Sequence, residues 1–227
     1  MENEIQPGLD GDFQLELDKL EACGNLRVLP ETCSDGKWIE AGGRRMLNLS
    51  SNDYLGLASD KALREEFLRT VKERIVLSSS SSRLLTGNFP AYRELESLLA
   101  SLFGAESALV FSSGYHMNTG ILPAVTDANT LILADKLVHA SLIDGIRLSA
   151  AKCIRYRHQD YAQLENLLAK HHGEYHRIIV VTESVFSMDG DVASLDRLVE
   201  LKRRYTNVML YVDEAHGIAV RASEDWG

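Results

Sequence analysis

The clearest fold signal in the chain is the stretch at residues 207–217, which reads NVMLYVDEAHG. Its five apolar residues from Val208 to Val212 are followed at once by an acidic cluster and a histidine. A short apolar run of this kind predicts a strand buried on both faces of a parallel sheet. Because ligands of open α/β sheets bind outside the carboxyl ends of the strands, we expect Asp213 and His216 to face a ligand. The alternative is that Asp213 only caps the next turn and that His216 forms a local hydrogen bond.

Similar apolar runs precede this stretch, and amphipathic segments separate them. Further strands are predicted at residues 108–111, 130–134, 153–157 and 178–182. Helices are predicted at residues 60–75, 90–103, 117–125, 141–149, 161–171 and 194–205. Strands that alternate with helices predict an α/β fold with a mostly parallel sheet flanked by helices.

The first part of the chain has a different pattern. We expect residues 1–58 to form an N-terminal segment that contains a helix over residues 14–22 and a small hairpin over residues 36–49. The hairpin turn is predicted near Gly42-Gly43, because glycine suits tight hairpin turns. Residues 59–227 are expected to form the N-terminal part of a larger domain.

A serine-rich tract at residues 78–88 reads SSSSSRLLTGN. One interpretation is a flexible linker between domains. The other is a loop of small residues beside Arg83 that backs closely against a ligand. Composition alone leaves both interpretations open.

Composition excludes several classes of function. The chain has 227 residues and a net charge of −9, which argues against a nucleic-acid surface because such surfaces are usually basic. Its three cysteines have no CxxC spacing, so neither a zinc site nor a disulfide framework is indicated, and we expect no metal. No apolar run approaches the length of a membrane span and no signal peptide is apparent. We therefore expect a cytoplasmic protein with neither nucleic-acid nor membrane partners.

Two nucleotide-binding interpretations fail. The tetrad DEAH at residues 213–216 also ends a strand in helicase-type NTPases, but that chemistry needs an upstream GxxxxGK[ST] loop. The one Gly-Lys pair of the sequence, Gly36-Lys37, is followed by Trp38 and lacks the loop pattern. No GxGxxG follows a predicted strand, so a dinucleotide site of the Rossmann type is unsupported.

Three other predicted strand ends carry polar groups. Residues 111–116 (FSSGYH) place small residues at a strand-to-helix turn, where free N–H groups can bind phosphate, although an ordinary helix capped by serine explains the motif as well. Residues 134–141 (ADKLVHAS) add the imidazole of His139, and residues 182–191 (TESVFSMDGD) add hydroxyls. With Asp213, this set suits a phosphorylated aromatic cofactor, because a buried carboxylate would hold a ring nitrogen protonated.

Six segments in one order resemble the α-oxoamine synthase family, over roughly residues 45–220. They are LSSNDYLGL (49–57), SSSSSRLLTGNFPAYRELE (78–96), FSSGYHMN (111–118), ADKLVHASLIDG (134–145), TESVFSMDGD (182–191) and VDEAHG (212–217). Members of this family are fold-type I enzymes that depend on pyridoxal 5′-phosphate (PLP) and condense an amino acid with an acyl thioester, with decarboxylation. The resemblance implies the large domain of a fold-type I PLP-transferase, truncated before the C-terminal domain, and a homodimer.

Within the family, the sequence of these segments is most similar to that of the member that joins L-alanine to a pimeloyl thioester in biotin biosynthesis. Glycine C-acetyltransferase, 5-aminolaevulinate synthase and serine palmitoyltransferase share the cofactor residues and stay open as alternatives. A catalytically inactive binding module of the same fold also stays open. The family's Schiff-base lysine is expected beyond residue 227, so we expect the isolated chain to be inactive.

The resemblance assigns roles around the cofactor. Asp213 would pair with the pyridinium nitrogen, and His139 would stack on the ring face. Backbone N–H groups of Gly114 and Tyr115 would hold the phosphate, in agreement with the helix-start argument.

The remaining roles concern the phenolic oxygen of the ring and the substrate. Ser187 and His216 would hydrogen-bond the phenolic oxygen, so His216 joins His139 and Asp213 as an implied catalytic residue. Asn52 lies in the substrate-facing SND motif, and Arg27 is a candidate for binding a substrate carboxylate.

Overall fold

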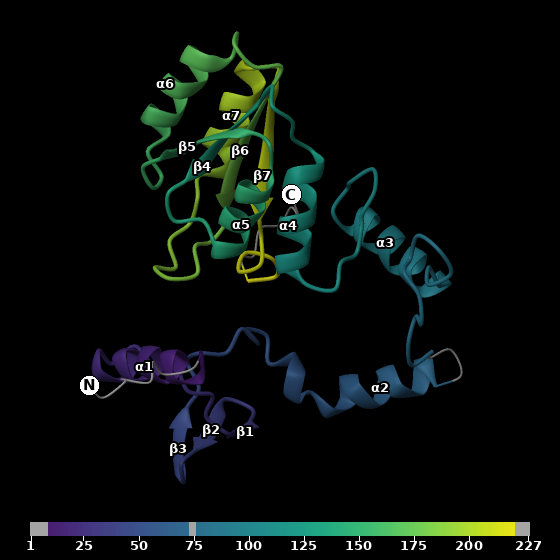
Figure 1. Cartoon of the computed structure of the whole chain (residues 1–227). Helices are drawn as coiled ribbons and strands as arrows, with labels where there is room; N and C mark the ends of the chain where they lie inside the picture. Colours follow the sequence, from purple (N-terminus) through teal and green to yellow (C-terminus); the bar gives the residue numbers. More distant parts are fainter. Residues whose placement is uncertain (1–8, 73–75, 221–227) are drawn as a thin grey trace, which may run out of the picture. The chain divides into compact units, whose positions relative to one another are not determined.

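The apolar run at residues 208–212, together with Asp213, forms a strand at one edge of the described parallel sheet in the computed structural model (Figure 1). Five of its six residues are half-buried, so the prediction of a strand buried on both faces is wrong for this edge strand. The sheet has the order β5-β4-β6-β7, and every pair of neighbours is parallel. Its strands are β4 (Thr130–Asp135), β5 (Lys152–Tyr156), β6 (Arg177–Glu183) and β7 (Val208–Asp213). The predicted α/β fold with a parallel sheet is therefore confirmed, because these four strands lie within one residue of their predicted ends.

The structure describes residues 9–72 and 76–220. The chain divides into two units, Met1–Lys72 and Glu73–Gly227. This division falls after Lys72, while the domain boundary expected after residue 58 stays a prediction. Within the described ranges, no helix has both the length and the apolar character needed to cross a membrane.

The first unit contains a three-stranded antiparallel sheet between two helices in the chain order. Its elements are α1 (Leu9–Ala22), β1 (Thr32–Asp35), β2 (Trp38–Ala41), β3 (Arg44–Leu47), the 3-10 helix η1 (Leu57–Ser59) and α2 (Lys61–Val71). Gly42 and Gly43 turn β2 into β3 with φ values of 54° and 72°, as a type I′ hairpin turn requires. The hairpin is confirmed. The helix predicted over residues 60–75 is found as α2, and residues 73–75 lie outside the described ranges.

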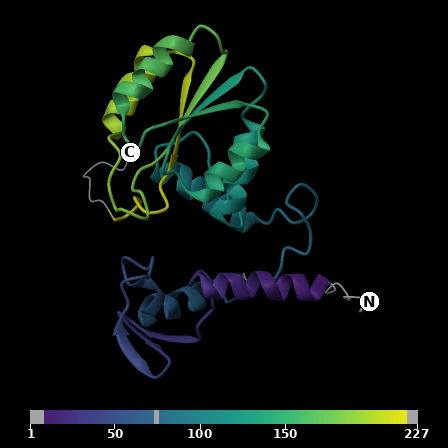
Figure 2. The same cartoon turned by 60° about the vertical axis from the view of Figure 1, so that its left-hand side comes forward.

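Helices cover both faces of the parallel sheet in the second unit (Figure 2). They are α4 (Gly114–Ala124) and α5 (Ala140–Leu148) on one face and α6 (Tyr161–His171) and α7 (Leu195–Arg204) on the other. A further helix, α3 (Pro90–Leu102), begins at Pro90, where the missing N–H has no helical partner to lose. All five helices were predicted.

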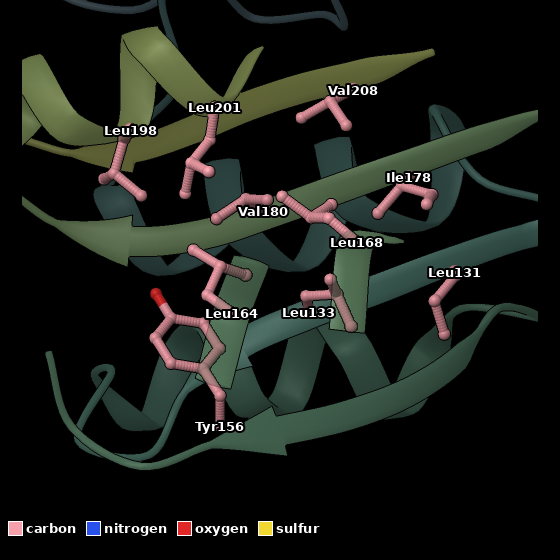
Figure 3. Close-up of a cluster of buried hydrophobic side chains, with 10 residues drawn as sticks. All are labelled: Leu131, Leu133, Tyr156, Leu164, Leu168, Ile178, Val180, Leu198, Leu201 and Val208. Atoms are coloured by element: carbon pink, nitrogen blue, oxygen red, sulfur yellow. The ribbon is translucent and has the colours of Figure 1, made fainter. Parts of the chain in front are cut away.

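Alternate residues of the central strands point to opposite layers of core. Leu131, Leu133, Ile178 and Val180 face Leu164 and Leu168 of α6 and Leu198 and Leu201 of α7 (Figure 3). Ile132, Ala134, Ile179 and Val181 face the other way, toward Leu122 of α4 and Leu142 of α5. Burying each leucine, isoleucine or valine of these two layers contributes about 1.5–3 kcal/mol, and this packing stabilises the sheet that carries the strand ends.

The strand predicted at residues 108–111 is wrong. The N–H of Val110 donates to Oε1 of Glu96 at 2.8 Å, and its carbonyl accepts from Nη1 of Arg83 at 3.2 Å. Because side chains already satisfy these backbone groups, Val110 does not pair with a strand in the described chain.

Helices α4 and α5 approach each other closely at one glycine. A Cβ built on Gly145 would lie 2.3 Å from the carbonyl oxygen of Asn118. Only a residue without a side chain fits there, so the glycine lets Asn118 of α4 lie beside the first turn of α5. This contact positions the site described next.

Candidate functional site

Strand β7 delivers Asp213 to the end of the sheet, where the carboxylate is half-buried. Its Oδ2 accepts from Nδ2 of Asn118 at 3.0 Å, and its Oδ1 accepts from the N–H of Ala215 at 3.0 Å. The hydroxyl of Tyr211 donates to Oδ1 of Asn118 at 2.8 Å. Burial, together with the charge of Asp213, raises the pKa of Tyr211 to about 12. The phenol therefore stays a hydrogen-bond donor and fixes the orientation of the Asn118 amide.

His139 is the N-cap of helix α5, and it follows β4 at the same end of the parallel sheet as Asp213. Its Nδ1 accepts from the N–H of Ser141 at 3.2 Å, which places the proton of a neutral ring on Nε2. Nδ2 of Asn118 also contacts Oγ of Ser141 at 2.9 Å, and that Oγ lies 2.8 Å from Nδ1 of His139. The structure thus brings Asp213 and His139 together in one hydrogen-bonded row, Asp213–Asn118–Ser141–His139.

A second carboxyl group contacts the backbone at the His139 end of this row. Glu183, at the end of β6, is 4% exposed, and its Oε1 accepts from the backbone N–H of His139 at 2.5 Å. Burial raises the pKa of the Glu183 carboxyl and the nearby charge of Asp213 adds to the shift, whereas the hydrogen bond from His139 opposes it. Glu183 therefore anchors the backbone at His139.

The start of α4 has the form of an anion site. Ser113 is the N-cap, and its Oγ accepts from the N–H of His116 at 3.2 Å. That bond serves the third helical residue, so the N–H groups of Gly114 and Tyr115 at the first two positions are available to a ligand. Tyr115 also ties α4 to α5, because its hydroxyl donates to Asp144 at 3.0 Å. Both interpretations of FSSGYH, an ordinary capped helix and a phosphate-binding turn, fit this geometry.

Ser187 and His216 lie in turns that follow β6 and β7. Ser187 is exposed in a turn closed by a hydrogen bond of 2.8 Å from the N–H of Gly190 to the carbonyl of Phe186. His216 is half-buried, and its neighbour Gly217 packs so tightly that a Cβ there would lie 2.2 Å from Oγ of Ser184. The two turns thus follow adjacent strands at the same end of the sheet.

The two substrate candidates belong to the first unit. Arg27 is exposed between α1 and β1. Asn52 is also exposed, and its Oδ1 accepts from the hydroxyl of Tyr54 at 3.5 Å. The roles of both residues stay predictions.

The serine-rich tract is anchored at Arg83. Its guanidinium contacts both carboxylate oxygens of Glu96 at 2.7 and 2.9 Å and stacks over Tyr92 at 4.3 Å. Gly87 turns so closely over Ser81 that a Cβ would lie 2.0 Å from the Ser81 carbonyl oxygen. These contacts are typical of a loop with a defined conformation, and the proximity of that loop to a ligand stays a prediction.

Three contributors to the site were missed from the sequence: Asn118, Ser141 and Glu183. Asn118 carried a usable signal, because a polar residue one helical turn before the buried Leu122 needs a polar partner inside the protein. Ser141 and Glu183 had no local signal, since their partners lie 23 and 44 positions away in the sequence.

A comparison with protein families matches the aminotransferase class I and II family over residues 44–226. The chain belongs to this family. The putative 8-amino-7-oxononanoate synthase of Glaesserella parasuis is 59% identical over 215 residues, which are 95% of this chain and 57% of that protein. The 8-amino-7-oxononanoate synthase of Haemophilus ducreyi is 58% identical over 222 residues, with the same two shares. The chain thus spans a little over half the length of these relatives.

Solved structures of aminotransferase relatives have the same fold. A serine palmitoyltransferase from Sphingomonas wittichii aligns with a TM-score of 0.80 at 28% identity, over 93% of this chain and 54% of that one. A variant serine palmitoyltransferase from S. paucimobilis, solved with a bound PLP–myriocin aldimine, aligns with a TM-score of 0.78 at 27% identity, over 92% and 53%. The 8-amino-7-oxononanoate synthase of Francisella tularensis aligns with a TM-score of 0.57 at 30% identity, over 73% and 44%. The predicted resemblance and the fold-type I large domain are confirmed.

Proposed function

We propose that this chain is the N-terminal, PLP-binding part of an 8-amino-7-oxononanoate synthase, which condenses L-alanine with a pimeloyl thioester and releases carbon dioxide. The observation that carries the proposal is the row Asp213–Asn118–Ser141–His139 at the strand ends. Identities of 58% and 59% to proteins of that name support the choice of substrates.

The residues present fit PLP by the chemistry of their donors and acceptors. Asp213 accepts hydrogen bonds from Asn118 and Ala215, which fix its carboxyl group at the strand end, and a carboxylate there is the type of group that would hold a proton at a pyridine nitrogen. The N–H groups of Gly114 and Tyr115 begin a helix, where phosphate is stabilised by the helix dipole. The cofactor supplies an electron sink for the electron pair left at the α-carbon of the amino acid.

Each residue of the row would have a distinct task. Asn118 orients the Asp213 carboxylate, and Tyr211 in turn holds the Asn118 amide. Ser141 fixes the imidazole of His139 so that its Nε2 carries the proton, and we assign His139 to the ring face and the substrate. Ser187 and His216, in the two neighbouring turns, would bind the phenolic oxygen.

We assign the Schiff-base lysine to sequence beyond residue 227 and further propose a homodimer that works in the cytoplasm. Arg27 and Asn52 would then contribute to the substrate site. The 227 residues by themselves are expected to show no turnover, because the covalent anchor of the cofactor and the general base would be missing.

A second candidate is serine palmitoyltransferase activity, because its solved structures align with higher TM-scores than the 8-amino-7-oxononanoate synthase structure does. The chain is 28% identical to the serine palmitoyltransferase of Sphingomonas wittichii but 59% identical to the putative synthase of Glaesserella parasuis, and this difference argues against the second candidate. An inactive binding module of the same fold is the third possibility that an assay must separate.

The test uses the protein expressed from its whole gene and loaded with PLP. L-alanine with pimeloyl-CoA, glycine with acetyl-CoA, glycine with succinyl-CoA and L-serine with palmitoyl-CoA are assayed in parallel for release of free thiol. We expect the highest kcat/KM for the alanine and pimeloyl pair. A preference for serine and palmitoyl-CoA would establish the second candidate, and thiol release at the enzyme-free rate with every pair would identify a binding module.

A further inference from the structure

The end of β4 and the loops that follow β5 and β6 meet at one imidazole, that of His158. Nδ1 of His158 lies 2.8 Å from Oδ1 of Asp135, and Nε2 lies 2.5 Å from Oδ2 of Asp191. Asp135 is the last residue of β4, His158 lies just after β5, and Asp191 lies after the turn that carries Ser187. None of the roles assigned above uses this cluster.

Both carboxylates that face the His158 ring have further hydrogen-bond partners. Asp135 is 1% exposed, its Oδ1 accepts from the N–H of Leu137 at 2.9 Å, and its Oδ2 accepts from the N–H of Gln159 at 2.9 Å. Nε2 of Gln159 donates to Oδ2 of Asp191 at 2.5 Å. Asp191 Oδ1 is buried and has no hydrogen-bond partner among the described residues, so the pairing of this carboxylate depends on its other oxygen.

The geometry defines the protonation state of the ring. An ionised carboxylate only accepts hydrogen bonds, and a neutral imidazole has only one N–H to donate. Because each ring nitrogen faces a carboxylate oxygen, both nitrogens must carry protons for both contacts to be hydrogen bonds. His158 is therefore an imidazolium between two carboxylates, and charge-assisted bonds of this type are among the strongest in proteins.

The electrostatics of the surroundings agree with this state. Burial of the ring lowers the pKa of His158, but its hydrogen bonds to Asp135 and Asp191 outweigh burial and the pKa is raised. The hydrogen bond from His158 lowers the pKa of the Asp191 carboxyl. Burial raises the pKa of three neighbouring groups, Tyr156, Tyr161 and Glu183, and the negative charge of these carboxylates adds to each shift.

We propose that His158 is a positioning residue that joins Asp135 to Asp191 and thereby holds the turn of Ser187 in place beside the strand end that leads to His139. The N–H of Phe186 donates to the carbonyl of Asp191 at 3.0 Å, so Asp191 is also the closing residue of that turn. The ring of Phe186 meets the His158 ring edge-on, with centroids 4.5 Å apart. We call the pair of contacts from His158 to Asp135 and Asp191 the clamp. The role of the Ser187 turn in catalysis rests on the function proposed above, whereas the clamp rests on these contacts alone.

The experiment compares three variants of the protein expressed from its whole gene. His158→Gln and Asp191→Asn each remove one charge of the clamp and keep a polar side chain of similar size. His176→Gln is the matched control, because His176 is an exposed histidine whose Nε2 lies 3.7 Å from Asp127 and which no site contact involves. Histidine ring-nitrogen NMR, amide hydrogen exchange and PLP titration are measured for each.

In the wild-type protein we expect the His158 ring to show two N–H signals at pH 7.5, and Asp191→Asn to remove one of them. Amide exchange at Phe186 and Gly190 is expected to rise in both clamp variants and to stay unchanged in His176→Gln. PLP is expected to bind roughly tenfold more weakly to both, on the scale of one charge-assisted hydrogen bond.

The outcomes separate the two proposals. A single N–H on the His158 ring, or wild-type exchange at Phe186 and Gly190 in both variants, would overturn the clamp even if PLP binds normally. Wild-type PLP affinity in variants with faster exchange would overturn its positioning role. If the wild-type protein fails to bind PLP while NMR and exchange behave as expected, the proposed function fails and the clamp stands. Because Asp191 lies near the surface, Asp191→Asn remains informative if His158→Gln does not fold.

Discussion

Nδ2 of Asn118 donates to Oδ2 of Asp213 at 3.0 Å, across 95 positions of sequence. Asn118 lies one helical turn beyond Gly114, so a single helix, α4, presents both the N–H groups proposed to bind phosphate and the amide that contacts the carboxylate of β7. The spacing between the phosphate end and the ring-nitrogen end of the proposed site is therefore set by a rigid element. Changes to Asn118 are expected to affect both stability and cofactor binding.

Replacing Asn118 by alanine removes the partner of both Asp213 and the Tyr211 hydroxyl. We expect the free energy of unfolding to fall by about 2 kcal/mol, because polar groups inside the protein lose their hydrogen bonds. Urea unfolding measures this, and Asn129→Ala, at an exposed asparagine, serves as the control. Equal midpoints for the two variants would contradict the role assigned to Asn118.

The helix contact at Gly145 yields a prediction with a built-in contrast. Gly145→Ala would place a methyl group 2.3 Å from the Asn118 carbonyl oxygen, and we expect it to destabilise the protein by about 3 kcal/mol. Gly120→Ala, in the exposed middle of α4, would meet only Phe111 at 3.7 Å and is expected to stabilise by about 0.5–1 kcal/mol. Thermal unfolding of the two variants should therefore shift in opposite directions.

Glu183 makes stability depend on pH. Its pKa is raised in the folded state, chiefly by burial, so its contribution to stability is fully present below the unfolded pKa of about 4.3 and is lost as the pH rises through the folded pKa. Glu183→Gln keeps an oxygen for the N–H of His139 and carries no charge. We expect the gain in unfolding free energy of this variant over wild type to increase with pH above about 4.3.

Urea unfolding between pH 4 and pH 8 tests this behaviour, with Glu200→Gln on the surface of α7 as the control. A difference between Glu183→Gln and wild type that stays constant over this range would refute the assignment. For the control, no such increase is expected.

Asp213→Asn tests the proposed cofactor chemistry directly. The amide oxygen can still accept from Asn118, so the fold should persist, but a neutral group cannot hold a proton on a ring nitrogen. We expect kcat/KM with L-alanine and pimeloyl-CoA to fall by about 100-fold or more, on the scale of losing one preorganised electrostatic contact. Asp196→Asn, at an exposed aspartate of α7, should retain wild-type activity. Unchanged activity of Asp213→Asn in the protein expressed from its whole gene would sink the proposal.

The central sheet could be predicted because its signal is local. Buried parallel strands such as β4 and β6 are short continuous apolar runs, and the helices between them repeat apolar residues with helical spacing. The strand β1 escaped prediction because all four of its residues are exposed and show no apolar alternation. Residues 108–111 misled for the opposite reason, since Arg83 and Glu96, 27 and 14 positions away, satisfy the backbone of Val110.

The candidate site was predictable at its strand ends and not between them. Asp213 and His139 stood out because strand ends of α/β sheets are where ligands bind. The groups that connect them, Asn118 and Ser141, depend on how closely α4 and α5 approach, and a single sequence does not specify that distance. The role of His158 could not be predicted for a similar reason, because its two carboxylate partners lie 23 and 33 positions away in the sequence.

Strand β7 has β6 on one side and, among the described residues, no strand on the other. An open row of backbone donors and acceptors beside half-buried side chains is a template to which a further strand can add. When nothing covers this edge, copies of a partly folded chain would associate through it. The segment that positions the carboxylate of residue 213 is thus also one of the two edges, with β5, at which a further strand could pair with the described sheet.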